Sequence, residues 1–113
     1  MKPKFDFVTG DKKVLQDATR TLELHVIKGL QHADGMLVAY LPKEKILLQG
    51  DLYAAPNPNA PAAPPNAPPN QGTVAFVDTL QRLGLTPDQI VSVHAPNPDR
   101  QIPRQEILAS IGR

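Results

Sequence analysis

Hydrophobic residues in the first half of the chain follow patterns that predict strands. Residues 4–8 alternate polar and apolar side chains, as a half-buried strand does. Val14 and Leu15 indicate a short return strand, and residues 21–27 alternate again, with leucine and valine on one face. His25 falls on the polar-patterned face of this last strand, where we interpret it as a structural residue.

Residues 32–51 predict a loop followed by a β-hairpin. Two apolar runs, at 36–41 and 46–48, are joined by the short polar turn of residues 42–45. Folding the second strand back on the first brings the two ends of this stretch to one edge of a sheet. His32 and Asp51, which mark those ends, are therefore expected to become neighbours.

The second half of the chain changes character after Asp51. Residues 54–72 hold seven of the thirteen prolines and no charged residue, which predicts an extended, exposed loop. Residues 73–83 follow as an amphipathic helix that ends at Gly84. Three further elements are predicted: a helical turn at 86–89, a strand at 90–93 and a closing helix at 103–111.

This order predicts a single α/β domain, residues 1–113, in which an antiparallel meander is followed by helix, strand and helix on a mixed sheet. A net charge of +1 and no basic run longer than two residues argue against nucleic-acid binding. No apolar segment approaches the roughly 20 residues of a membrane helix. As written, the product is expected to be soluble and cytoplasmic, since its charged N-terminus does not form a signal peptide.

Three potential metal ligands lie at strand ends or in the loops beside them: His32, Asp51 and His94. Two imidazoles and a carboxylate suit zinc or iron. Spacing alone does not separate ligands from ordinary hydrogen-bonded residues, so both readings stay open. Tyr53 lies close by and is a candidate for lining a substrate pocket or for packing against the proline-rich loop.

The order of these pieces resembles the C-terminal half of the metallo-β-lactamase superfamily over residues 21–112. The matching features are the His-x-x-Gly turn at His32, the hairpin, the Gly-Asp pair that ends at Asp51, and the strand histidine His94. The resemblance implies half of an αββα sandwich. It also implies that His32 and His94 bind different metals, that Asp51 bridges them, and that a zinc-bound water hydrolyses the substrate.

One departure from the family changes the expected function. The His-x-His-x-Asp-His motif, which supplies the remaining ligands, is absent from a chain with three histidines in all, and Ala95 replaces the usual glycine. We therefore expect a truncated, hydrolase-derived protein with an incomplete zinc site that is inactive alone. Half a sandwich also leaves one sheet face bare, which predicts a homodimer.

Two alternatives remain. The chain is a non-catalytic binding or interaction module, or it is half of a hydrolase whose missing N-terminal half is supplied by another polypeptide.

Overall fold

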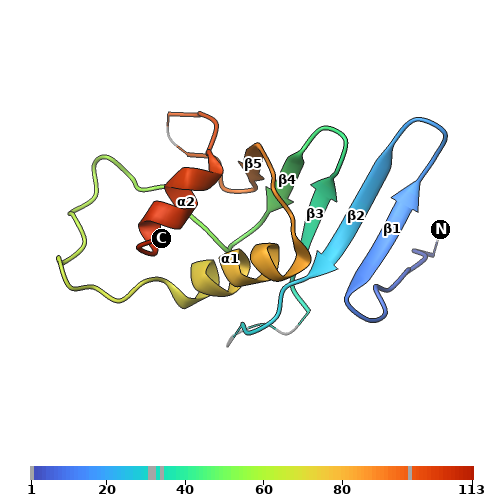
Figure 1. The fold of residues 1–113 in the computed structure, drawn as a ribbon, viewed down its shortest axis with the longest axis horizontal. Coiled ribbons are helices and arrows are strands. Elements are labelled where there is room, and N and C mark those ends of the chain that lie inside the picture. The colour runs from blue at the N-terminus through green and yellow to red at the C-terminus, as the bar shows by residue number, and fades with distance from the viewer. Residues whose placement is uncertain (1, 31–32, 34, 97) are drawn as a thin grey trace.

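The described part of the chain forms a five-stranded mixed sheet with two helices (Figure 1). The computed structural model describes residues 2–30, 33, 35–96 and 98–113. The strands are β1 (Lys12–Gln16), β2 (Thr21–Val26), β3 (Leu37–Leu41), β4 (Ile46–Gln49) and β5 (Gln89–Ser92). The helices are α1 (Gln71–Leu83) and α2 (Arg104–Ser110). This arrangement confirms the predicted fold class.

The strands lie in the sheet in the order of the sequence. β1 to β4 form an antiparallel meander, in which β3 and β4 make the predicted hairpin with Leu41 opposite Ile46. Lys45 closes the hairpin turn with a positive φ of 55°. β5 then pairs parallel to β4, because the chain returns through α1 before it joins the sheet.

Helix α1 has a defined signal at each end. The Asn70 side chain accepts a hydrogen bond from the Thr73 backbone N–H at 3.0 Å, which satisfies one of the free donors of the first turn. The Thr73 hydroxyl donates to the Leu52 carbonyl at 2.8 Å and so ties the helix to the end of β4. Gly84 ends the helix in the left-handed conformation, as predicted.

The core lies between the helices and one face of the sheet. Cross-strand partners share a face, so the register places Tyr40, Leu47 and Ile90 side by side. These side chains join one buried cluster with residues from both helices, among them Phe76, Leu80 and Ile107. The opposite face of the same strands carries mainly apolar side chains that are half-buried or exposed.

Two predicted elements are wrong. Residues 4–8 do not form a strand; Phe5 and Phe7 are 73% and 74% exposed and stack on each other with ring centroids 6.4 Å apart. Alternation favours a strand only where a neighbouring strand accepts its hydrogen bonds. Residues 86–89 do not form a helical turn, because the N–H groups of Asp88 and Gln89 donate to the Lys45 carbonyl and extend the β4–β5 pairing.

The proline-rich segment has the irregular, largely exposed conformation that its composition predicts. Residues 54–70 contain no helix or strand, and α1 begins directly after them. Within the part of the chain that the structure describes, no helix has the length and apolar character needed to cross a bilayer.

Candidate functional site

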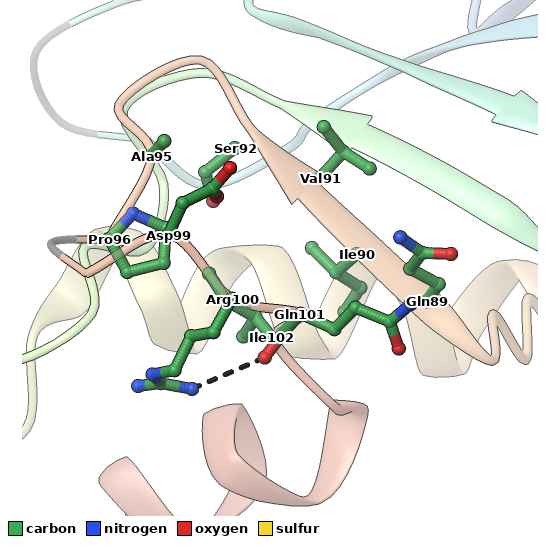
Figure 2. A pocket seen from close by; sticks show the side chains of 10 residues that line it. All are labelled: Gln89, Ile90, Val91, Ser92, Ala95, Pro96, Asp99, Arg100, Gln101 and Ile102. Carbon is green, nitrogen blue, oxygen red and sulfur yellow. Dashed lines mark hydrogen bonds between the residues drawn. The ribbon is translucent and has the colours of Figure 1, made fainter.

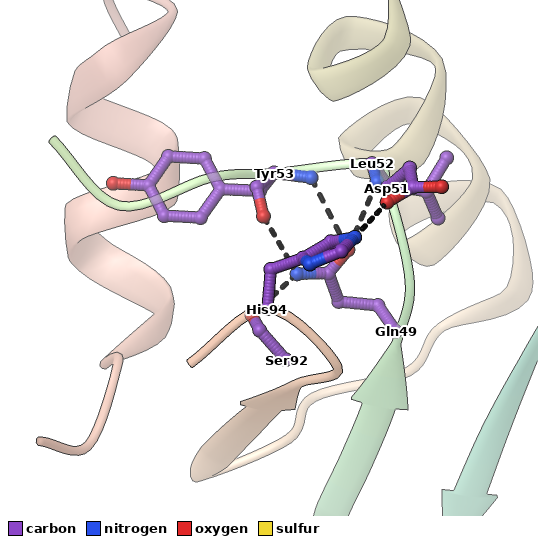
Figure 3. A network of polar contacts seen from close by, with 6 residues as sticks. All are labelled: Gln49, Asp51, Leu52, Tyr53, Ser92 and His94. Atoms are coloured by element: carbon purple, nitrogen blue, oxygen red, sulfur yellow. Dashed lines mark hydrogen bonds and ion pairs between the residues drawn. The ribbon is translucent and has the colours of Figure 1, made fainter. Parts of the chain in front are cut away.

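Asp51 and His94 meet at one edge of the sheet. Asp51 follows the end of β4 and His94 follows the end of β5. Because these two strands are parallel, their carboxyl ends lie at the same edge. The His94 Nε2 atom is 2.7 Å from Asp51 Oδ1, and each side chain is 70% exposed (Figure 3). The structure thus brings two of the three candidate ligands together; the third, His32, lies outside the described residues.

A buried glutamine fixes the turn that carries Asp51. Gln49 is 2% exposed, and its Oε1 accepts the backbone N–H groups of Leu52 and Tyr53 at 3.0 and 3.2 Å. Its Nε2 donates to the Tyr53 carbonyl at 2.8 Å and to the Ser92 hydroxyl at 2.5 Å (Figure 3). One side chain therefore links the turn after β4 to the end of β5, and it holds the segments of Asp51 and His94 in register.

Tyr53, the candidate substrate-pocket residue, lies in the core. It is 6% exposed, and its hydroxyl donates to Glu106 Oε1 at 2.9 Å. Arg100 donates to both oxygens of Glu106, at 2.6 and 2.7 Å, and this hydrogen bonding lowers the pKa of the Glu106 carboxyl. Burial, with the hydrogen bond to Glu106, raises the pKa of Tyr53 to about 12. The Tyr53 ring therefore joins the site edge to α2.

Two hollows border the Asp51–His94 pair. One, of about 490 Å³, is lined by Asp51, by the start of α1 and by Leu30, Ala33 and Met36. The other, of about 200 Å³, is lined by His94 and the beginning of the proline-rich segment, including Pro56. Both candidate ligands are therefore open to a molecule that approaches the edge of the sheet.

A separate cavity of about 360 Å³ lies along the outer side of β5 (Figure 2). Its lining includes Ser92, Asp99 and Arg100, but neither Asp51 nor His94. The guanidinium of Arg100 is held by Glu106 and by the Gln101 carbonyl. This cavity shares Ala95 and Pro96 with the hollow beside His94, but neither candidate ligand lines it.

The Asp51–His94 pair fits zinc in donor type but supplies only part of a ligand set. Two ligands of a tetrahedral zinc ion lie about 3.3–3.6 Å apart, at metal distances of about 2.0–2.2 Å. The pair is closer than this, at 2.7 Å, so a small separation would admit the ion. Among the described residues, no group of three histidine, cysteine, aspartate or glutamate side chains is placed to hold a metal.

His25 lies away from this edge. It is 2% exposed in β2, on the face that the helices cover, and its Nε2 is 2.9 Å from Glu23 Oε1. Burial in a strand with a carboxylate partner agrees with the structural role assigned to it. The sequence reasoning missed Gln49, although an amide at an inward-facing strand position, two residues after Leu47, was a usable signal.

Comparisons with known proteins identify the fold. No protein-family model and no curated protein matches the sequence. Among solved structures, a metallo-β-lactamase from Pontibacter korlensis is similar, with a TM-score of 0.64 and 20% identity over 97% of this chain and 48% of that one. TMB-1, studied for substrate and inhibitor binding, has a TM-score of 0.61 at 18% identity, over 93% of this chain and 44% of its own. The chain has a metallo-β-lactamase fold, as the resemblance predicted, and spans about half the length of these structures.

Proposed function

We propose that this chain is a metallo-β-lactamase-like half-fold that keeps a metal-binding pair, Asp51 and His94, and does not catalyse hydrolysis by itself. The observation that carries the proposal is the contact between their side chains at 2.7 Å, at the shared carboxyl ends of β4 and β5. Sites are commonly assembled on loops at such an edge. Zinc, when bound, would supply Lewis-acid chemistry, and the two side chains would hold the ion.

Exposure supports a binding role over a structural one for this pair. A contact between two side chains that are each 70% exposed contributes little to stability, about 0–1 kcal/mol even for oppositely charged groups. Yet the turn beneath it is fixed by three hydrogen bonds with the buried Gln49 side chain, and a fourth joins that side chain to Ser92 on β5. A rigid support under two accessible ligands suits the positioning of an ion.

His32 is the proposed third ligand. Leu30 and Ala33, its described neighbours in the sequence, line the same hollow as Asp51, which supports this assignment. The sequence holds three histidines, and His25 is buried beside Glu23. Catalytic zinc sites take about three protein ligands, so His32, Asp51 and His94 would hold one ion and would not by themselves build a dinuclear hydrolytic site.

Zinc titration by calorimetry tests the proposal. We expect saturable uptake of one zinc per chain, and an affinity loss of about tenfold or more in Asp51→Ala and in His94→Ala, because each removes a ligand. Asp99→Ala is the matched control, since it removes an exposed carboxylate that lies outside the pair. Absence of uptake, or uptake that survives both substitutions, would contradict the proposal.

Hydrolysis is tested separately. The zinc-loaded chain alone should not hydrolyse lactam, thioester or phosphoester substrates. Activity that appears only when a polypeptide carrying the His-x-His-x-Asp-His motif is added would show that the site is completed in trans.

A second candidate function is a non-catalytic interaction module. The uncovered, largely apolar face of the sheet favours it, because apolar patches of this kind usually mark interaction surfaces. Purified protein that holds no zinc, with a free energy of unfolding that a chelator leaves unchanged, would favour this candidate.

A further inference from the structure

The sheet face opposite the helices is apolar across all five strands. The register aligns Leu24, Ala39, Leu48 and Val91 in one row from β2 to β5. The members of this face, which we call the open face, are Lys13, Leu15, Leu22, Leu24, Val26, Leu37, Ala39, Leu41, Ile46, Leu48, Gln89 and Val91. Ten of these twelve side chains are apolar, whereas a sheet face in contact with water normally carries polar side chains.

None of these side chains is buried: four are exposed and the other eight are half-buried. Leu15 is 45% exposed, and Leu37, Leu48 and Val91 are each 39% exposed. The same strands place their other side chains, such as Val38, Leu47 and Ile90, at 2% exposure or less under the helices. From β3 to β5, one face is therefore packed as a core under the helices, and the other face has the apolar composition of a core but no second layer packed on it among the described residues.

We propose that a second copy of this chain covers the open face, giving a twofold dimer with the two sheets packed face to face. A twofold dimer uses the same patch on both copies, so the patch must be compatible with itself. The single charged member, Lys13, lies on the edge strand and pairs with Asp6. Two open faces can therefore meet without burying a repulsive pair of charges.

The open face is about as large as the largest apolar patch of a typical monomer. Strands about 4.8 Å apart and residues about 3.3 Å apart give five short strands a flat footprint of about 400 Å². The accessible area is larger than the footprint because side chains project from it. The footprint alone is about half of the roughly 800 Å² per partner of a stable interface, and it lies within the range of about 300–600 Å² for the largest apolar patch of a monomer.

The proposed dimer leaves the candidate metal site accessible. Asp51 and His94 lie beyond the strand ends, at the edge of the sheet, and not within the open face. The dimer therefore does not depend on zinc and does not rest on the proposed function. Measuring it in the presence of a chelator separates a failure of this inference from a failure of the metal proposal.

Sedimentation of the purified chain with chelator, from 1 to 100 µM, tests the inference. We expect a species of twice the 12.3 kDa chain mass. Leu48→Lys should raise the dimer dissociation constant about 100-fold or more, because it buries an unpaired charge in the middle of each face. Val14→Lys is the matched control: Val14 is 42% exposed in the same sheet but on the other face, so its dimer should be unchanged.

Thiol accessibility provides a second readout if Leu48→Lys does not fold. The chain has no cysteine, so Leu48→Cys and Val14→Cys each introduce a single thiol. At high protein concentration the thiol at position 48 should react at least tenfold more slowly than the thiol at position 14, and dilution should remove the difference. Equal reactivity at 100 µM, a monomer at 100 µM, or a dimer that Val14→Lys disrupts would overturn the inference. So would a chain that stays monomeric alone and associates only with a polypeptide that carries the missing half.

Discussion

At the scale of single residues, Tyr53 joins two elements of the fold. Its ring is buried, and its hydroxyl reaches Glu106 on α2, which Arg100 holds in a charge-assisted pair. A neutral hydroxyl donating to a carboxylate is stable only while the tyrosine keeps its proton. The contact between the site edge and α2 therefore depends on the protonation state of one residue.

Tyr53→Phe should lower the free energy of unfolding by about 1–2 kcal/mol at pH 7, because it removes a buried hydrogen bond to a charged group. The pKa of Tyr53 is raised from 10.0 to about 12, so the folded state keeps the proton after the unfolded state begins to lose it. The stability from this contact is complete below pH 10 and is lost as the pH rises toward about 12. Urea unfolding of the unaltered chain and of Tyr53→Phe between pH 7 and pH 12 measures the difference between their free energies of unfolding. This difference should decrease above pH 10. A difference that stays constant across that range would contradict the dependence of this contact on the Tyr53 proton.

At the scale of elements, the turn after β4 is held by three hydrogen bonds with the Gln49 side chain. Gln49→Leu keeps the volume but leaves the Leu52 and Tyr53 backbone groups without their buried partner. We expect a loss of at least about 2 kcal/mol in the free energy of unfolding. We also expect weaker zinc binding, although neither Asp51 nor His94 is altered. Gln16→Leu, an exposed change in β1, should stay within about 0.5 kcal/mol and leave zinc binding unchanged.

The same elements show what the sequence could predict. Local patterns located the β3–β4 hairpin, α1 with its stop at Gly84, and β5, because each has a strong periodicity bounded by turn or cap residues. Residues 86–89 carry a capping pattern but join β4, since their N–H groups pair with the Lys45 carbonyl. The partner that decides between a helical turn and a strand, Lys45, lies 43 residues before Asp88 in the sequence. Local propensity therefore cannot reveal it.

The candidate site was predictable as far as strand order was predictable. The sequence places Asp51 and His94 at the ends of two strands. Because those strands are parallel neighbours in the sheet, this placement brings the two side chains into contact. The Gln49 network was not predicted, because its four hydrogen bonds join a side chain to a turn and to Ser92 on another strand. Such contacts depend on the final packing and leave no periodic signal in the sequence.

At the scale of the whole molecule, the open face links stability to association. If folding and covering of this face are one event, unfolding a dimer releases two chains, so the midpoint must rise with protein concentration. For a dimer of two 113-residue chains, an unfolding entropy of about 2.1 cal/mol/K per residue gives a rise in Tm of about 3 °C for each tenfold increase in concentration. Calorimetry of the chain at 2, 20 and 200 µM measures this dependence. Leu48→Lys should remove it and Val14→Lys should keep it, since only the first alters the open face. A Tm that is independent of concentration in the unaltered chain would mean that the sheet is stable with one face uncovered, and the helix-side core alone would then have to account for the fold.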